Sequence, residues 1–359
     1  METTTLTPVL TKPGPYATVL VDVSEDSETG RQQHLARVRA ACDELATQGA
    51  PTDVIERVAA VLDEQTSAPA PVARLVVSTP EEIVYDELAM LRQDRTITSW
   101  DPLPDLTAWA AHRDAQVRFV LAVLDHAGGE VSLWDSDVPE PREETTAGGE
   151  VQYIHQVPVG GWASIEVQRT SENVWRHNAE DVVAEVRRLA AAHTPDAVLI
   201  AGDPTSCGIA RRELTNLQAP VTVLPTGQRH SDGGDEALHQ AIRESLHQIV
   251  IARRMSLVER ARESMGKGSG IAIGVRDVTD ALVQGQVETL LFDPARAAEL
   301  QLDPRDHPGL SFGAASVEGP VRADEALIAA AVLTEAEIVA LPSAALGGAP
   351  VAGLLRWTP

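Results

Sequence analysis

The chain has 359 residues, which is enough for two or three domains of ordinary size. With 43% hydrophobic and 23% charged residues it has the composition of a soluble globular protein, and no apolar run approaches the roughly 18 to 20 residues of a membrane-spanning helix. The formal net charge of −24 argues against broad, nonspecific binding to nucleic acid or anionic lipid. We therefore expect a multidomain protein without a membrane or DNA partner, in which any RNA contact is local.

The N-terminal stretch and the cysteines indicate the compartment. "METTTLTPVLTKPGPYATVLVDVSED" lacks the basic, apolar and small-residue parts of a secretory signal, so a cytoplasmic location is expected. Cys42 and Cys207 form no Cys-x-x-Cys pair, so we expect two buried small side chains and neither a disulfide framework nor a cysteine zinc site. Lys12 and Lys267 are the only lysines, and the arginines supply planar donors suited to phosphate.

Residues 1–111 predict a small α/β domain. A strand is expected over 18–23, helices over about 31–48 and 53–64, and another strand over 73–79, which "EEIVYDEL" follows. The domain is expected to end after the proline-bearing "WDPLPDLTAW".

Residues 112–230 predict a second α/β domain. "VRFVLAVLDHAGGEVSLWDSD" has two apolar runs around a Gly-containing turn, which is typical of a hairpin. A strand "SIEVQRT", a helix over about 171–193, a buried strand over 196–203, a further helix and "APVTVLPTG" follow. Alternating strands and helices indicate a partly parallel sheet.

Residues 231–359 predict a third α/β domain, so the fold class is α/β in three domains. A helix over about 237–264 precedes "MGKGSG". After it we expect a helix "VRDVTDALVQG", a strand "VETLLF", a helix "ADEALIAAAVLT", a strand "EIVALP" and the closing "LGGAPVAGLLRWTP".

Several motifs known from other sites are weak here. "MGKGSG" lacks the spacing of a P-loop and follows a helix, where a P-loop follows a strand. Asp22, Asp125 and Asp203 lie at or near the ends of predicted strands, where carboxylates hold a metal, act as a base or, more commonly, cap turns and helices. The histidines lack zinc spacing and no Gly-x-Ser-x-Gly elbow occurs. We therefore predict no catalytic residue, metal or cofactor.

The stretch "VPVGGWASIEVQRTSENVWRHNAEDVVAEVRRLA" carries the strongest signal. Gly160 and Gly161 before Trp162 are typical of a loop tip that brings its backbone close to another surface and presents one aromatic side chain. Trp162 could instead be a core residue at the start of a strand. The basic residues that follow alternate with acidic ones and by themselves indicate a solvated helix: Arg169, Arg176, His177, Arg187 and Arg188.

This stretch resembles the start of the middle domain of archaeal and eukaryotic class 1 release factors and Pelota, where a Gly-Gly-Gln loop precedes a long helix. "MGKGSGIAIGVRDVTDALVQGQVETLLF" resembles a segment of the same family that ends in "AL..G.VETLL", and "LGGAPVAGLLRW" resembles its closing "GGI.AILRY". The resemblance covers roughly 160–357 and indicates the bacterial branch of this superfamily, in the actinobacterial group similar to the hibernation factor Balon. The first domain resembles nothing so specifically.

The resemblance implies an RNase H-like middle domain, a last domain like the kink-turn-binding ribosomal proteins, and a place in the ribosomal A site. The first domain would then lie toward the decoding region. The rRNA-contacting loop would point toward the peptidyl-transferase centre and consist of Gly160, Gly161 and Trp162. The candidate contacts to RNA phosphates would be Arg169, Arg176 and His177.

Trp162 stands where release factors have the glutamine associated with positioning water for peptidyl-tRNA hydrolysis. An indole has one N–H donor and no acceptor, so it cannot orient water as an amide does. It can stack on an exposed base, which is worth about 1 to 3 kcal/mol. We therefore favour a non-enzymatic role, in which the protein occupies the A site during ribosome hibernation or rescue under stress.

Two other functions stay open at this point. One is a peptidyl-tRNA or aminoacyl-tRNA hydrolase with a variant loop, and the other is a stress-response interaction protein that no longer binds ribosomes. The partner implied by the resemblance is the ribosome, joined by a translational GTPase such as elongation factor Tu.

Overall fold

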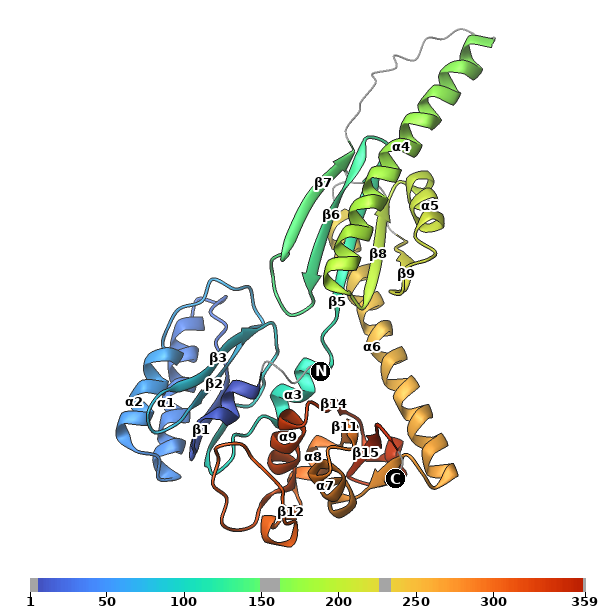
Figure 1. The fold of residues 1–359 in the computed structure, drawn as a ribbon. Coiled ribbons are helices and arrows are strands. Elements are labelled where there is room, and N and C mark those ends of the chain that lie inside the picture. Colours follow the sequence, from blue (N-terminus) through green and yellow to red (C-terminus); the bar gives the residue numbers. More distant parts are fainter. Residues whose placement is uncertain (1–5, 149–161, 226–233, 358–359) are drawn as a thin grey trace. The chain divides into compact units, whose positions relative to one another are not determined.

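The computed structural model describes residues 6–148, 162–225 and 234–357, with the side chains of 162–175 and 234–235 outside that description. The chain forms two compact units (Figure 1). Unit 1 consists of Met1–Gln116 together with Arg253–Pro359, and unit 2 consists of Val117–Ala252. Helix α6 (Gly234–Lys267) begins in unit 2 and ends in unit 1. None of the helices in the described ranges is long and apolar enough to cross a membrane.

The N-terminal part of unit 1 is an antiparallel sheet with the strand order β3-β2-β1-β4. Its elements are η2 (Thr7–Thr11), β1 (Tyr16–Asp22), α1 (Gly30–Thr47), α2 (Thr52–Leu62), β2 (Ala73–Ser78), β3 (Ile83–Ala89), β4 (Ile97–Asp101) and α3 (Thr107–Asp114). Alternate residues of a strand point to the same face, so Ala17, Val19 and Val21 all pack against α1 and α2. Tyr16 and Leu20 face the opposite way, into a second core.

The C-terminal part of unit 1 is a mixed sheet with the strand order β10-β15-β11-β14, in which only β11 and β14 are parallel. Its strands are β10 (Ile271–Ile273), β11 (Val287–Phe292), β14 (Glu337–Ala340) and β15 (Val351–Leu355), with a small ladder of β12 (Gln301–Leu302) and β13 (Val321–Arg322). Its helices are α7 (Val275–Val283), α8 (Pro294–Ala298), η3 (Pro304–Asp306), α9 (Ala323–Leu333) and η4 (Ser343–Leu346).

One hydrophobic core joins the two parts of unit 1. Helix α9 is buried from Ala323 to Val332, as expected for a helix that is apolar on all sides after Glu325. The core around α9 contains Tyr16 and Trp109 from the N-terminal part of unit 1 and Phe292 from the C-terminal part. The domain limits predicted from the sequence, 1–111, 112–230 and 231–359, remain a prediction. The first and third of these ranges lie mostly within unit 1.

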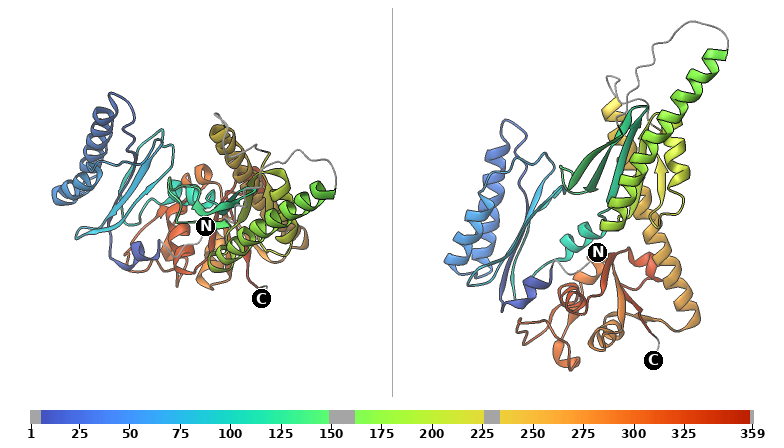
Figure 2. Two further views of the ribbon diagram at one scale, coloured as in Figure 1. Left: turned by 90° about the horizontal axis from the view of Figure 1, so that it is seen from above. Right: turned by 45° about the horizontal axis from the view of Figure 1, so that its top comes forward.

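Unit 2 contains a five-stranded sheet with the strand order β7-β6-β5-β8-β9. Its elements are β5 (Arg118–Asp125), β6 (Gly128–Asp135), β7 (Glu143–Gly148), α4 (Trp162–His193), β8 (Ala197–Gly202), α5 (Pro204–Glu213) and β9 (Val221–Val223). The first three strands form an antiparallel meander, and β8 and β9 are added in parallel to β5. Helices α4 and α5 cover one face of this sheet and the first half of α6 covers the other (Figures 1 and 2).

The α/β class predicted from the sequence is confirmed, and so are the hairpin of β5 and β6 and the strand "VETLLF", which is β11. The strand predicted for "SIEVQRT" is wrong, because α4 begins at Trp162 and includes this stretch. A short alternation of apolar residues also fits a helix, and no glycine or proline interrupts the chain between Trp162 and His193.

Candidate functional site

The loop predicted to contact rRNA lies between β7 and α4. Gly160 and Gly161 fall outside the described residues, as do the side chains of Trp162 and Arg169. Strand β7 ends at Gly148, and α4 begins at Trp162 directly after the glycine pair. The structure therefore describes the strand before this segment and the helix after it.

Two glycines fix the end of the sheet from which the loop leaves. Gly128 and Gly148 face each other across β6 and β7, with φ values of 137° and 84°. A Cβ atom on Gly128 would come within 2.3 Å of the carbonyl oxygen of Ala147, and one on Gly148 within 2.8 Å of the Gly128 Cα. Both positions therefore need glycine, because any other residue would force the two strands apart.

Asn178 fastens α4 to the same end of the sheet. Its side chain is 1% exposed, and its Nδ2 donates a hydrogen bond of 3.0 Å to the carbonyl oxygen of His126, in the turn between β5 and β6. A buried amide with a made hydrogen bond positions a helix more firmly than apolar contact alone. The part of α4 that precedes Asn178 thus leaves the sheet from a fixed point.

Charge pairs hold the other end of α4. Arg188 donates to carboxylate oxygens of Glu185, at 2.8 Å for the closest pair, and of Glu143 in β7, while His193 lies 3.5 Å from Glu143. The hydrogen bonds from Arg188 hold the pKa of Glu185 below its usual value. Arg187 donates to the backbone carbonyl of Glu213 at 2.6 Å. Arg187 and Arg188, which are weaker candidates for phosphate contacts, are therefore paired within unit 2.

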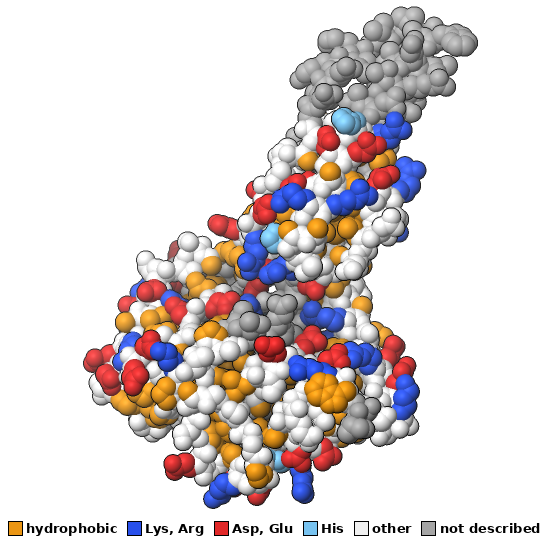
Figure 3. Space-filling model, viewed as in Figure 1, with side chains coloured by type: hydrophobic (Ala, Val, Ile, Leu, Met, Phe, Trp, Pro, Cys, Tyr) orange, Lys and Arg blue, Asp and Glu red, His pale blue; other side chains and the backbone are white. Residues whose placement is uncertain are grey.

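Arg176 and His177 are exposed near the start of the described part of α4. Their side chains are 61% and 63% exposed, and each lies 3.8 Å from a carboxylate oxygen of Glu180. Pairs of this kind are weak in water. Glu180 is not the only residue with which Arg176 interacts. Basic and acidic side chains alternate on the face of unit 2 that Figure 3 shows.

The strand-end aspartates act as caps. Asp203 Oδ2 accepts from the N–H of Ser206 at 2.8 Å and begins α5, and Asp125 Oδ1 accepts from the N–H of Ala127 at 2.8 Å. Asp22 accepts from Arg37. In the described ranges, no three His, Cys, Asp or Glu side chains are grouped so that they could hold a metal ion.

The two cysteines are free thiols. Cys207 is buried as predicted, and burial raises its pKa to about 11, which keeps the thiol protonated. Cys42 is half-buried, so the expectation of full burial is wrong for this residue. It lies near the C-terminal half of α1, at the edge of the core that α1 and α2 share with the sheet.

Unit 1 contains a buried charge cluster that the sequence did not predict. Arg322 donates to Asp105 Oδ2 at 2.7 Å and to the two carboxylate oxygens of Asp324 at 3.1 and 2.5 Å. Asp324 also accepts from the hydroxyl of Thr107 at 2.7 Å. Asp105 and Arg322 are 217 positions apart, so no local pattern could have revealed the cluster.

Glu325 is a third carboxylate beside the same guanidinium. Its Oε1 lies 3.1 Å from Arg322 Nη1 but accepts no hydrogen bond from the described part of the chain. Burial raises the pKa of Glu325 to about 9, against the attraction of Arg322, so this carboxyl is protonated at neutral pH. One arginine thus balances the other carboxylates, and the cluster ties α9 to the segment around α3.

Comparison with known proteins identifies the middle of the chain. Residues 118–267 match the family described as bacterial archaeo-eukaryotic release factor family 2. The chain is 24% identical over 339 residues to MT2704 of Mycobacterium tuberculosis (strain CDC 1551 / Oshkosh), covering 91% of this chain and 89% of that protein. The same values hold for Rv2629 of the H37Rv strain.

The chain is also similar to solved structures. An archaeal Pelota, from a model of ribosome-bound archaeal Pelota and ABCE1, is 15% identical and matches 98% of this chain and 92% of its own, with a TM-score of 0.43. Saccharomyces cerevisiae Dom34 is 10% identical, over 100% of this chain and 94% of its own, with a TM-score of 0.41. Archaeoglobus fulgidus Pelota is 15% identical over 79% of each chain, with a TM-score of 0.32. All three TM-scores are low, so the family match is the finding that bears on function.

Proposed function

We propose that this chain, a bacterial release-factor-like protein over residues 118–267, is a translation factor that binds the ribosome and occupies the A site without releasing peptide. The observation that carries the proposal is the family match, because it includes the loop before α4 and the whole of that helix. Occupancy would serve ribosome hibernation or rescue, and a translational GTPase such as elongation factor Tu would be the second partner.

The chemistry of Trp162 favours occupancy over hydrolysis. An indole N–H can donate but nothing in the ring accepts, so the side chain cannot align a water molecule for attack. The flat ring can stack on an unpaired base, and such stacking contributes about 1 to 3 kcal/mol. In this proposal Gly160 and Gly161 let the backbone come close to rRNA while Trp162 anchors the loop.

Arg176 and His177 would contact phosphates beside the loop. Both side chains are exposed, and their pairs with Glu180 are surface pairs, which contribute little to stability. Since acidic side chains alternate with the basic ones on the visible face of unit 2, we expect only a few phosphates to be neutralised. Ribosome binding should then weaken with salt along a shallow slope, because the slope grows with the number of phosphates contacted.

Co-sedimentation with vacant ribosomes at physiological salt tests the proposal. We expect the wild-type protein to pellet with ribosomes and Trp162→Ala to bind about tenfold more weakly, since 1.4 kcal/mol corresponds to a factor of ten. Trp357→Ala is the matched control, because Trp357 is also exposed (51%) but lies in unit 1, outside the matched residues. Absence of wild-type binding, even with elongation factor Tu present, would leave an interaction protein that does not bind ribosomes.

Peptide release separates occupancy from the hydrolase alternative. Ribosome complexes that carry labelled peptidyl-tRNA should release no more peptide with the protein than with buffer. Peptide release above that level would favour the hydrolase alternative, provided that Trp162→Ala abolishes the release and Trp357→Ala does not.

A further inference from the structure

β4 is an edge strand of the N-terminal sheet, and one side chain already binds part of its free edge. β4 pairs only with β1. Gln48, at the end of α1, accepts from the N–H of Trp100 at 2.7 Å and donates to the carbonyl oxygen of Thr98 at 3.2 Å. The backbone groups of Thr98 and Trp100 therefore point away from β1.

Two more backbone groups of this edge, the N–H of Thr98 and the C=O of Thr96, have no hydrogen-bond partner among the described residues. The N–H and C=O of one strand residue point to the same side, so the N–H of Thr98 points outward with its carbonyl. The C=O of Thr96 also points outward, because it shares a peptide unit with the N–H of Ile97, which faces β1. A free donor and a free acceptor thus flank Ile97, in the arrangement that one residue of an added parallel strand would bond.

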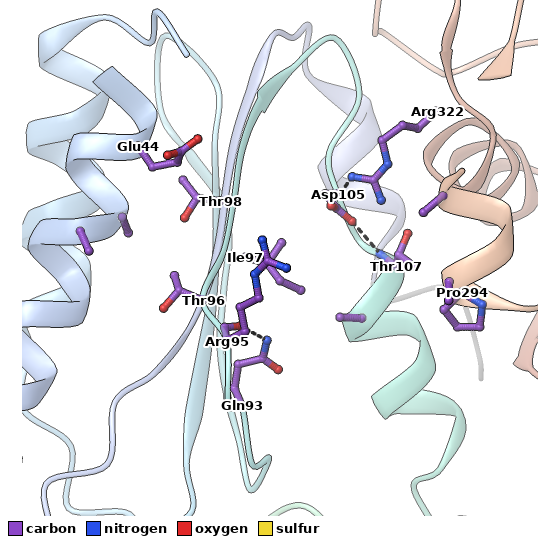
Figure 4. Close-up of a pocket in the computed structure, with 15 residues that line it drawn as sticks. Glu44, Gln93, Arg95, Thr96, Ile97, Thr98, Asp105, Thr107, Pro294 and Arg322 are labelled. Carbon is purple, nitrogen blue, oxygen red and sulfur yellow. Dashed lines mark hydrogen bonds and ion pairs between the residues drawn. The ribbon is translucent and has the colours of Figure 1, made fainter. Parts of the chain in front are cut away.

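The free edge opens into a cavity of about 800 Å³ (Figure 4). Figure 4 shows Thr96 and Thr98 on the side of Glu44 and Ile97 on the side of Pro294, so β4 forms the floor between two walls. One wall contains Ala40, Ala41 and Glu44 of α1, and the other contains Thr107 and Ala108 of α3 with Pro294, Ala295 and Ala298 of α8. Most of these side chains are short and apolar, so the space above β4 is left for side chains from another molecule.

Arg95 gives the groove an available positive charge. It is exposed at the start of the floor and forms no ion pair within the described ranges. Arg322 also lines the cavity, but Asp105 and Asp324 already bind its guanidinium. A ligand that lies along β4 would therefore find one unpaired guanidinium, which favours a carboxylate at that point.

We propose that this groove binds an extended segment of a partner protein, which adds to β4 as a parallel strand. One residue of the segment lies beside Ile97, accepts from the N–H of Thr98 and donates to the C=O of Thr96. Apolar side chains before and after it fill the space against the alanine walls, and a carboxylate of the segment meets Arg95. This is strand addition to an exposed edge, with main-chain bonds for affinity and wall pockets for specificity. It concerns unit 1 and does not depend on ribosome binding.

Other occupants fit the groove less well. Two copies of this chain joined at β4 by a twofold axis would pair antiparallel, and that pairing needs the carbonyl of Thr98, which Gln48 already binds. The edge also lies between α1 and α8, so a second folded sheet would meet the helices before it met the strand. A single extended chain has neither difficulty.

Thr98→Pro tests the pairing directly. Proline removes the outward N–H and is tolerated on an edge strand where that N–H faces away from the ladder, so we expect this variant to fold. Ser99→Pro is the matched control. The N–H of Ser99 faces β1, so we expect this variant to melt at a lower temperature. If Thr98→Pro were the more damaged of the two, the assigned direction of the edge would be wrong.

The binding probe is a library of random ten-residue peptides displayed on phage and selected on the wild-type protein. We expect the enriched peptides to carry alternating apolar residues and an acidic residue. They should bind at least tenfold more weakly to the Thr98→Pro and Ala295→Arg variants than to the wild type. Ala295 is exposed, and the arginine at this position would fill the groove. Arg95→Ala should weaken only the acidic peptides.

Three outcomes would overturn the proposal. They are the absence of any enriched peptide, equal binding of the peptides to Thr98→Pro, and a wild-type dimer in sedimentation that Thr98→Pro dissociates. The last outcome would make a second copy of the chain the occupant.

Discussion

The two units differ in where they keep their charges. Among its described residues, unit 1 buries four carboxyl groups, those of Asp105, Asp114, Asp324 and Glu325. Among the described residues of unit 2, Asp137 is the single buried carboxylate. The arginines along α4 lie at the surface instead, where Arg176 pairs loosely with Glu180.

Buried and exposed charges act differently. Removing one partner of a buried pair leaves the other without water or counter-charge and costs several kcal/mol, whereas an exposed pair contributes between nothing and about 1 kcal/mol. The charges of unit 1 therefore fix its shape. The exposed pairs along α4 contribute little to stability.

The largest effect is expected for Asp114→Ala. Asp114 ends α3, is fully buried, and accepts hydrogen bonds from Arg254 Nε at 3.0 Å and Nη2 at 2.6 Å. Arg253 donates to the backbone carbonyl of the same residue. Without the carboxylate, two guanidinium groups face each other in a partly dry site. We expect the free energy of unfolding to fall by about 3–5 kcal/mol in urea denaturation.

Arg188→Ala is the corresponding change in unit 2. Arg188 is half exposed and pairs with Glu143 and Glu185 at the surface. We expect its urea midpoint to stay within error of the wild type. Equal losses of unfolding free energy in Asp114→Ala and Arg188→Ala would contradict the proposed difference between buried and exposed charges in the two units.

The next largest effect is expected for Glu325→Gln, and it depends on pH. The pKa of Glu325 is raised from 4.5 to about 9 by burial, so between these values the folded protein holds a proton that the unfolded chain has released. The contribution of Glu325 to stability is therefore greatest below pH 4.5 and falls as the pH rises toward 9. Glutamine never ionises, so Glu325→Gln should be more stable than the wild type by about 1–3 kcal/mol at pH 8 and equal to it at pH 4.5.

Thermal melts across this pH range measure the effect. Asp324→Asn is the control in the same cluster, because Asp324 accepts hydrogen bonds from Arg322 and Thr107. It should destabilise at both pH values. A Glu325→Gln curve parallel to that of the wild type would mean that Glu325 is ionised in the folded protein.

A smaller effect is expected for Asn178→Ala, within unit 2. The change removes one hydrogen bond to the carbonyl of His126, a turn residue that water can reach, so we expect a loss of about 1 kcal/mol. Hydrogen exchange should show faster exchange in α4 and no change in the strands of unit 1. A loss as large as that of Asp114→Ala would mean that unit 2 also depends on buried polar contacts.

The elements predicted well from the sequence have local signals. β11 was predicted residue for residue, and the hairpin of β5 and β6 followed from two apolar runs around Gly128 and Gly129. The start of α4 was wrong because "SIEVQRT" fits both periods, and only its continuity with the following residues makes it helical.

The site was predictable only in part, for a physical reason. Gly160, Gly161 and Trp162 are adjacent in the chain, so the sequence alone marks them. The contacts that frame the site join residues brought together by folding, as Asn178 and His126 are across 52 positions. Sequence spacing says nothing about such pairs, because the strand order that creates them is itself a product of the whole fold.

The smallest effect on stability is expected for the double change Arg169→Glu with Arg176→Glu, although its effect on binding should be clear. Arg176 is exposed, so the urea midpoint should not move. Ribosome binding should weaken, and the slope of log affinity against log salt should become shallower by about 1 for each phosphate that the variant no longer neutralises. Arg211→Glu with Arg212→Glu changes the charge equally at exposed positions of α5. If both double variants bound ribosomes equally weakly, repulsion between the more negative protein and RNA would account for the effect. Weaker binding of the α4 variant alone would show that local phosphate contacts guide an acidic protein to RNA. Unchanged binding in both would remove Arg169 and Arg176 from the site.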